Sequence, residues 1–468
     1  MLSNHHLLDA LSEFLTRFCR FCKHVILVLS RAVPGLTMLM LGAAIARAES
    51  FTFSTAAGLA GSSPVLGMSG DGSNNLARFT SPAGVCLDSA NAIYITDGHL
   101  VRRMTALGTN WVVTTLAGLP GNSGSSDGTN SGARFDQPEG IALDASGNLF
   151  VADTINNAVR KVSPVGTNWV VTTIAGMAGS VYSGSADGTN NSARFNHPYG
   201  IATDPSGNLF VADTYNSTIR KITPAGTNWV VSTLAGSASY SGSADGTNGS
   251  ARFNGPTSLT IDNATNIYVA DFNNHTIRKA VLIGTNCVVG TIAGYAGASG
   301  GADGTNSSAR FYFPQALCED SFGNLYVSDA GNNTIRKLKA AGTNWVVTTV
   351  AGLAGASGSA DGTGSAALFS DPFGLAMDPL GRLFVADSMN KTMRLGRAAI
   401  LLDMSLSSSQ LRLSWPIAAT NYALEMNSNI SGGGSWNAII SGITASGDTY
   451  VFNTNATAAR AFFRLHKP

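Results

Sequence analysis

The feature that most constrains this chain is a unit of about 58 residues that occurs six times. Two aspartates mark each unit, one in an Asp-Gly pair and one closing a "VAD"-type element. Both series advance by 56, 60, 58, 58 and 58 residues along the positions Asp71, Asp127, Asp187, Asp245, Asp303 and Asp361, and Asp97, Asp153, Asp213, Asp271, Asp329 and Asp387. A fixed period of this kind sets the fold before any local pattern does.

Each unit contains four short β-like runs separated by turn residues. In the third unit we predict strands at 200–203, 209–213, 218–222 and 229–234. Gly, Asn and Pro occupy the connections, while Val, Ile, Phe and Thr fill the runs. The runs are apolar on both faces, as expected for strands packed between two neighbouring sheets. Four antiparallel strands per unit, packed face to face around an axis, predict an all-β, six-bladed β-propeller.

The ends of the array predict how the ring closes. Every unit except the last finishes with an outer strand such as "NWVVTTLAG" at 110–118. The sixth unit runs past 391–395 into "GRAAILLD" without one, whereas "FTFSTAAG" at 51–58 precedes the first Asp-Gly pair. We therefore expect the N-terminal strand to lie antiparallel beside 391–395 and complete the sixth blade. Such closure leaves no unpaired sheet edge.

The first 48 residues differ from the array. They combine basic residues, a short apolar stretch and a final Ala-Arg-Ala, which predicts a signal peptide at 1–48, cleaved after Ala48. A membrane anchor is the alternative, but Arg31 and Pro34 interrupt the apolar run that an anchor needs. We expect a secreted or periplasmic protein with no stable membrane span after cleavage, and a propeller domain at 49–400.

Residues 401–468 do not repeat. Runs such as "LRLSWP", "TYVFN" and "AFFRLHKP" predict five or six strands of a small C-terminal β-sandwich. Its expected core is Trp415, Tyr422, Trp436 and Phe463. The segment resembles short C-terminal modules of secreted proteins from some environmental bacteria, which would make this a bacterial extracellular protein.

Composition excludes one class of partner and one kind of scaffold. Charged residues make up 12% of the chain and the net charge is +1, so no clustered basic face for nucleic acid is expected. Outside the leader, the cysteines are Cys86, Cys287 and Cys318. Three cysteines without close partners do not make a disulfide framework. We interpret them as small core residues.

The repeat itself resembles a known family. The text "P-x-G-I-A-x-D…G-N-L-F-V-A-D-x-x-N-x-x-I-R-K…A-G" is similar to the NHL repeat, in a long version with "DGTxxxARF" ahead of it. The match covers about 51–397. The resemblance implies a six-bladed propeller and, for most relatives, a binding or scaffolding role. A minority of relatives are enzymes, including an amidating lyase with a metal in its central channel.

The polar residues that recur in every unit are interpreted as architecture. Asp213 ends the second strand and Arg220 begins the third, so a hairpin brings the two charges together, as in the other units. A second series, Arg194 and its equivalents in "ARF", could form a basic collar for an acidic ligand. Since a residue that recurs in every blade usually has a structural role, we expect each such arginine to hold its own loop in place.

Ligand binding is expected where the units differ. Strand topology places the long segments such as 183–197 and the turns such as 214–217 at one end of the ring, which we call the loop face. The residue after each conserved Pro opens the innermost strand there, and the residue before that Pro differs between units as well. The mixture of residue types suits a sugar or peptide, although neutral variation would also produce it. The candidate ligand-binding residues are Glu139, His197, Tyr199, Thr257, Gln315 and Phe373.

Metal and acid–base chemistry are not expected. Three histidines, His99, His197 and His275, fall on loop-face segments but too widely spread to meet at one metal. The unrepeated carboxylates Glu139 and Asp371 would need to approach to about 5–10 Å for paired catalysis. We predict no catalytic residue, metal or cofactor.

Three functions remain in consideration. The leading hypothesis is a secreted propeller that binds a protein or carbohydrate on the loop face, with no nucleic-acid partner. The alternative is a metal-dependent lyase or lactone hydrolase with its site at the central channel. The third is a structural surface protein without a discrete ligand.

Overall fold

The computed structural model describes residues 50–61, 69–238 and 240–398, and six C-terminal segments. Those segments are 402–407, 410–416, 422–427, 436–446, 449–455 and 462–466. Contacts divide the chain into two compact units, of which one is Ala48–Arg397 and the other contains the C-terminal strands. The predicted signal peptide at 1–48 lies outside the described residues. Within them, no helix has the length and apolarity needed to cross a membrane.

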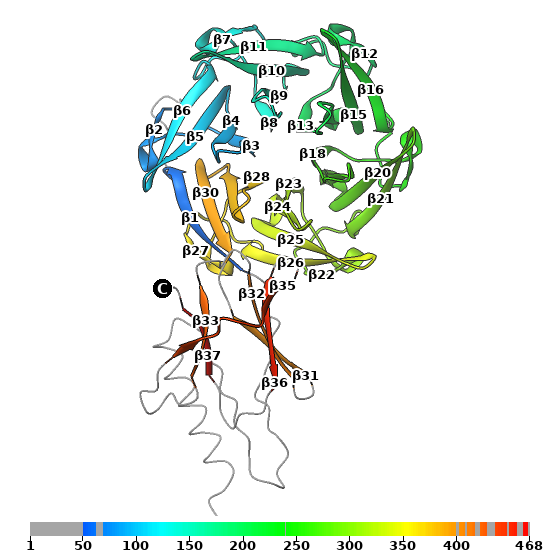
Figure 1. Cartoon of the computed structure of the whole chain (residues 1–468). Helices are drawn as coiled ribbons and strands as arrows, with labels where there is room; N and C mark the ends of the chain where they lie inside the picture. The colour runs from blue at the N-terminus through cyan, green and yellow to red at the C-terminus, as the bar shows by residue number, and fades with distance from the viewer. Residues whose placement is uncertain are drawn as a thin grey trace, which may run out of the picture. The chain divides into compact units, whose positions relative to one another are not determined.

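The described part of Ala48–Arg397 is a six-bladed β-propeller, as predicted (Figure 1). Each blade is an antiparallel sheet whose innermost strand begins at the conserved Pro. The innermost strands are β3 (Pro82–Leu87), β8 (Pro138–Leu143), β13 (Pro198–Thr203), β18 (Pro256–Ile261), β23 (Pro314–Glu319) and β28 (Pro372–Met377). The second strands are β4 (Ile93–Asp97), β9 (Leu149–Asp153), β14 (Leu209–Asp213), β19 (Ile267–Asp271), β24 (Leu325–Asp329) and β29 (Arg382–Asp387).

Two longer strands follow in each blade. The third strands are β5 (Leu100–Leu107), β10 (Ala158–Val165), β15 (Thr218–Ala225), β20 (Thr276–Ile283), β25 (Thr334–Ala341) and β30 (Thr392–Ala398). The fourth strands are β6 (Asn110–Gly118), β11 (Asn168–Ala175), β16 (Asn228–Gly236), β21 (Asn286–Gly294), β26 (Asn344–Gly352) and, for the sixth blade, β1 (Phe51–Gly58). Val, Leu, Ile, Phe and Tyr fill most positions of the buried second strands, which are enclosed from both sides.

Each blade also has a fifth strand that the sequence did not predict. It is two residues long, comes from the "DGT" segment and pairs with the fourth strand at the rim. These strands are β2 (Gly72–Ser73), β7 (Gly128–Thr129), β12 (Gly188–Thr189), β17 (Gly246–Thr247), β22 (Gly304–Thr305) and β27 (Gly362–Thr363). A single turn of 3-10 helix follows each: η2 (Asn74–Leu76), η3 (Asn130–Gly132), η4 (Asn190–Ser192), η6 (Asn248–Ser250), η8 (Asn306–Ser308) and η10 (Gly364–Ala366). The prediction of four strands per unit was therefore one strand short.

The ring closes as the sequence predicted. Strand β1 lies between β27 and β30 in the sixth sheet and pairs antiparallel with β27, with Phe53 opposite Gly362. The Phe51 side chain is buried and meets the ring of Tyr326 edge-on, with ring centroids 5.7 Å apart. In other blades a Trp at the same strand position makes this contact, as Trp229 does with Phe150 at 5.6 Å. The N-terminal strand thus supplies both the edge pairing and the blade-to-blade contact.

A fully buried arginine links the inner hairpin of each blade to its outer loop. In the third blade, Arg220 donates from Nη1 to Asp213 Oδ2 at 2.8 Å and from Nη2 to Asp187 Oδ1 at 2.7 Å. The same nitrogens also donate to the main-chain carbonyls of Arg194 and Ala186. Its guanidinium lies 5.1 Å from the centroid of the Phe195 ring, within cation–π range. The equivalent buried arginines are Arg102, Arg160, Arg278, Arg336 and Arg394.

The buried carboxylate is itself held by several donors. Asp213 Oδ1 accepts from the Asn196 main-chain N–H at 2.7 Å, and Oδ2 accepts from Asn216 Nδ2 at 2.8 Å. These contacts join the start of the innermost strand, the turn η5 (Thr214–Asn216) and the third strand at one point. Because every long loop is fastened in this way, the repeated charges are structural, as the sequence analysis inferred.

The C-terminal strands form two small sheets. One sheet has the order β31 (Asp403–Ser407), β32 (Gln410–Pro416), β36 (Thr449–Asn455), β35 (Ile443–Ser446), and the other β34 (Asn437–Ala438), β33 (Ala423–Asn427), β37 (Phe462–His466). Trp415 and Phe463 are buried in a shared core, against which Tyr422 packs. Trp436 is half-buried instead, with the Arg464 guanidinium 4.3 Å from its ring centroid, so its placement in the core was wrong.

Replacing Asp213 by Ala should lower the free energy of unfolding by about 3–5 kcal/mol, because the buried Arg220 guanidinium loses the buried one of its two carboxylates. Arg194→Ala should cost only about 1–2 kcal/mol, because its guanidinium bonds main-chain carbonyls at a partly exposed site. Urea unfolding followed by tryptophan fluorescence measures both. A loss for Asp213→Ala no larger than that for Arg194→Ala would contradict this structural role.

Candidate functional site

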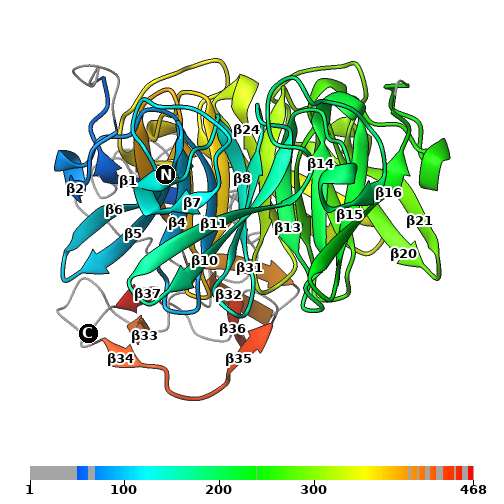
Figure 2. The same cartoon turned by 90° about the horizontal axis from the view of Figure 1, so that it is seen from above.

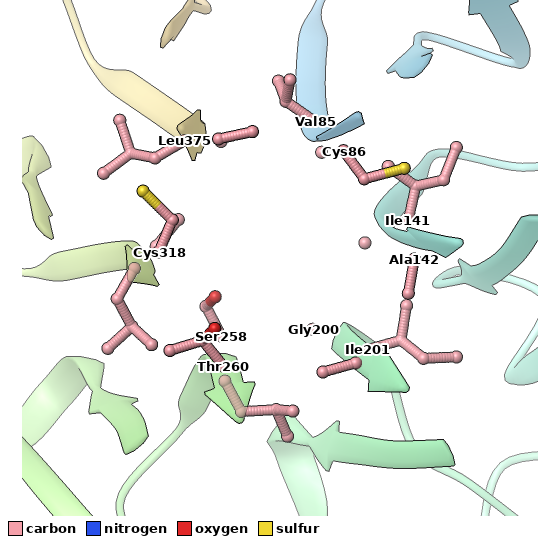
Figure 3. Close-up of a pocket in the computed structure, with 18 of the residues that line it drawn as sticks. Val85, Cys86, Ile141, Ala142, Gly200, Ile201, Ser258, Thr260, Cys318 and Leu375 are labelled. Carbon is pink, nitrogen blue, oxygen red and sulfur yellow. The ribbon is translucent and has the colours of Figure 1, made fainter. Parts of the chain in front are cut away.

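The innermost strands of all six blades line a central channel with a volume of about 390 Å³ (Figure 3). Its lining is apolar midway, where Figure 3 shows Val85, Ile201 and Leu375 around the opening. Cys86 and Cys318 also lie along this wall. Cys318 is buried, and Cys86 is partly buried and packs against a core cluster, so the prediction that both are small core residues is confirmed. The third cysteine, Cys287, is fully buried as expected.

Close contact between neighbouring innermost strands keeps the channel narrow. A Cβ on Gly140 would lie 2.2 Å from the Tyr199 carbonyl oxygen, and one on Gly374 would lie 2.1 Å from that of Ala83. Only glycine allows such an approach of two backbones. Five blade junctions gain a further link from a hydroxyl group that donates to a carbonyl of the next blade, as Thr214 Oγ1 does to Pro256 at 2.7 Å. The mouth is thus built on a rigid ring.

Five of the six candidate ligand-binding residues lie around the channel on the innermost strands: Glu139, Tyr199, Thr257, Gln315 and Phe373. Glu139, Tyr199 and Phe373 are half-buried, so part of each side chain remains accessible. Thr257 and Gln315 are buried, and the Thr257 hydroxyl donates to the Gln315 carbonyl at 2.8 Å. These two residues therefore shape the mouth more than they expose groups to it.

The sixth candidate, His197, lies beside the channel rather than in it. Its ring stacks on Tyr215, with centroids 4.2 Å apart and planes inclined by 23°. Its main-chain N–H donates to Asn157 Oδ1 of the preceding blade at 2.9 Å. The other loop-face histidines, His99 and His275, occupy the repeat position that Asn157 has in the second blade. His99 Nδ1 accepts from the Gln137 N–H at 3.4 Å, and His275 Nδ1 accepts from the Phe313 N–H at 3.3 Å.

Carboxyl groups give the mouth its electrostatic character. Burial, together with the negative charge of nearby Asp371, raises the pKa of Glu139 to about 8. Burial also raises the pKa of Asp371. The pKa of Tyr199 rises to about 12 through burial, with contributions from Glu139 and Tyr215. Glu139 and Asp371 belong to blades two and six, and the blade between them presents only the small Ala83 at this position.

The "ARF" arginines supply no basic collar, as the sequence analysis inferred. Arg194 Nη1 donates to the main-chain carbonyls of Asn191 at 2.5 Å and Ala193 at 2.8 Å, so it fastens its own loop. The same two bonds form at Arg78, Arg134, Arg252 and Arg310. Among the described residues, no three or more His, Cys, Asp or Glu side chains gather where they could hold one metal ion.

Several aromatic residues of the loop face were missed by the sequence analysis. Phe313 stacks on Phe272 of the preceding blade at 4.6 Å and on Tyr312 at 4.5 Å. Tyr215 is 62% exposed and Tyr312 is 38% exposed. The Tyr215 position holds Ile, Asn, Gly or Met in other blades, so the rule that binding residues vary between units applied to this turn as well. Candidates were predicted only at the two positions that flank the conserved Pro, so Tyr215 was not among them.

Comparison with known proteins agrees with the repeat pattern. The NHL repeat profile matches residues 135–162, 195–222 and 253–280. Protein SUPPRESSOR OF QUENCHING 1, chloroplastic, from Arabidopsis thaliana is 31% identical over 294 residues, which are 59% of this chain and 26% of that protein. NHL repeat-containing protein 2 from Bos taurus is 36% identical over 154 residues, or 31% of this chain and 21% of that protein. The chain therefore spans about a quarter of the length of these relatives.

Solved structures show the same fold. An auxiliary nutrient binding protein from Bacteroides ovatus superposes with a TM-score of 0.54 at 14% identity, covering 75% of this chain and 77% of its own. At that identity, the likeness speaks for the fold alone.

Carbon-13 NMR titration of the glutamate carboxyl groups should find Glu139 with a pKa of about 8. Asp371→Asn should lower that pKa, because it removes a negative neighbour, but burial should keep it above the ordinary glutamate value. Glu319, at the other end of the channel with a pKa of about 7, is the internal control and should not move. An unchanged Glu139 pKa in Asp371→Asn would show that the two groups do not interact.

The same shift predicts a pH-dependent stability. Since the pKa of Glu139 is higher in the folded chain than in the unfolded one, ionisation opposes folding and stability falls as the pH rises toward about 8. Glu139→Gln should therefore raise the melting temperature more at pH 9 than at pH 5. An equal difference at both pH values would exclude this linkage.

Proposed function

Because the chain belongs to the NHL-repeat family, we propose that it is a secreted binding module that holds a protein or glycan on the loop face of its propeller. A binding or scaffolding role is consistent with this fold. The observation that carries the proposal is that repeated and unrepeated residues differ in their burial and contacts. Repeated charges such as Arg220 and Asp213 are buried and paired with each other, whereas unrepeated side chains such as Tyr199 and Phe373 remain accessible at the mouth.

The lining of the mouth supports recognition of an uncharged or weakly polar surface. Aromatic rings supply flat apolar contacts, and the Glu139 carboxyl, protonated in large part at neutral pH, can donate a hydrogen bond. Pockets that combine apolar walls with a few polar groups are the usual form of ligand sites. The auxiliary nutrient binding protein that shares the fold gives a precedent for a binding role on this architecture.

We propose further that the module does not catalyse a reaction. The rival function, a metal-dependent lyase or lactone hydrolase, needs at least three ligands around one ion near the axis, and the loop-face histidines His99 and His275 are occupied as acceptors of main-chain N–H groups. The Glu139–Asp371 pair is the remaining acid–base candidate. Recovery of a bound ligand chemically unchanged after long incubation tests this proposal, and its conversion by wild type but not by Glu139→Gln would overturn it.

Export follows from the leader predicted at 1–48. We propose that the chain is delivered to the periplasm or the medium and cleaved after Ala48. N-terminal sequencing of the exported protein should then begin at Glu49. Ala48→Arg, which removes the small residue at the cleavage site, should leave the leader attached. An exported wild-type chain that retains its leader would contradict this proposal.

Binding on the loop face is tested with paired aromatic variants. The whole chain is first screened on a combined glycan and peptide array, and the Kd of a hit is then measured. Tyr199→Ala and Phe373→Ala should each raise that Kd about tenfold, the order of one lost aromatic contact. Phe322→Ala is the matched control, because this ring is 48% exposed on a turn of the opposite face. Loss of binding in the control alone would place the site on the opposite face and contradict binding at the loop face.

A further inference from the structure

The loop face carries two aromatic stacks on neighbouring blades. The first is Tyr215 on His197 in the third blade. The second places Phe313 between Phe272, from the fourth blade, and Tyr312. Because each ring is packed on another, its plane is fixed before any ligand arrives, which reduces the entropic cost of binding. The outer rings, Tyr215 and Tyr312, remain substantially exposed.

A polar position joins the two stacks. Gly255 lies close to Asn273 of the same blade, since a Cβ on Gly255 would be 2.6 Å from Asn273 Nδ2. The same Cβ would be 4.0 Å from Cγ2 of Thr214, the residue before Tyr215 in the third blade. Asn273 is exposed, and its neighbour in sequence is Phe272. The order across the three blades is therefore aromatic stack, amide, aromatic stack. At the equivalent of Gly255 the neighbouring blades have His197 and Phe313.

The charges nearby disfavour an anionic ligand. Arg194, Arg252 and Arg310 of these blades donate to the carbonyls of their own loops. Burial lowers the pKa of both His197 and His275, which favours the neutral form of each ring. At the channel mouth, the Glu139 carboxyl lies close enough to Tyr199 of the third blade to contribute to its raised pKa. Such a surface offers hydrogen bonds and flat apolar faces, and its arginines already donate to carbonyls of their own loops.

We propose that these stacks are two subsites for an uncharged oligosaccharide, with the Asn273 amide bonding to sugar hydroxyls between them. The inference rests on the proposed function and specifies its ligand class. A pyranose ring presents a flat face of C–H groups that covers one aromatic ring, and its edge carries hydroxyls that pair with amides. A proline-rich peptide also packs on aromatic rings, but its prolines carry no N–H donors for the Asn273 carbonyl.

Calorimetric titration of the whole chain tests the assignment. The probes are hexasaccharides of β-1,4-glucose, β-1,3-glucose and β-1,4-mannose, an acidic hexagalacturonate, and decaproline. We expect at least one neutral hexasaccharide to bind with a Kd below about 1 mM. Tyr215→Ala and Phe313→Ala should each raise that Kd about tenfold, and Asn273→Ala by about threefold. Melting curves establish that each variant is folded.

Met389→Ala is the matched control, because Met389 occupies the Tyr215 position in the sixth blade and is 68% exposed. Its Kd should stay within about twofold of wild type. The proposal is overturned if no neutral hexasaccharide binds at about 5 mM, if hexagalacturonate or decaproline binds more tightly, or if folded Tyr215→Ala and Met389→Ala bind alike. A peptide ligand that is lost in Tyr199→Ala would leave the proposed function standing and remove this inference. A loss of all array binding would remove the proposed function itself.

Discussion

The propeller depends on a guanidinium that is buried between two carboxylates in each blade. Arg220 joins Asp213 at the end of the second strand to Asp187 in the long loop, and Phe195 covers its face. One such arginine with its two carboxylates holds the inner hairpin, the rim and the long loop of its blade together. Since a buried charge without its partner costs several kcal/mol, any substitution within the group is strongly opposed. The cost explains why the text that encodes it recurs with so little change. The similar blades that result are drawn in two views in Figures 1 and 2.

This rigid frame frees other positions to vary. Residues at the mouth, such as Glu139 and Tyr199, sit on innermost strands held by close backbone contacts and by hydroxyl-to-carbonyl bonds between blades. Their side chains therefore change from blade to blade without disturbing the ring. The turn that holds Tyr215 behaves in the same way. The Tyr215 main-chain N–H donates to the Asn196 carbonyl, and the side chain of the next residue, Asn216, donates to Asp213. Six similar blades can thus present one asymmetric face.

Much of the fold could be predicted because the period and the strand text are local properties of the sequence. The match between "FTFSTAAG" and the other outer strands predicted the place of β1 in the sixth blade. The Asp213–Arg220 ion pair was predicted because the two residues lie on adjacent strands of one hairpin. The rim strands escaped prediction because two residues carry no periodicity. Contacts between blades were also hidden. His275 replaces an asparagine as the acceptor of a main-chain N–H, and Phe272 stacks on Phe313. Both contacts depend on which turn meets which loop across a blade boundary.

The central claim is that unrepeated loop-face residues bind the ligand while repeated residues maintain the ring. Hydrogen–deuterium exchange of the whole chain, with and without a saturating ligand from the array, tests it most directly. We expect slower exchange at 196–199, 254–257 and 312–315 and in the turns 214–217 and 272–275. The opposite-face turns 144–148 and 204–208 should not change. Protection confined to the opposite-face turns, or spread evenly over all six blades, would contradict it.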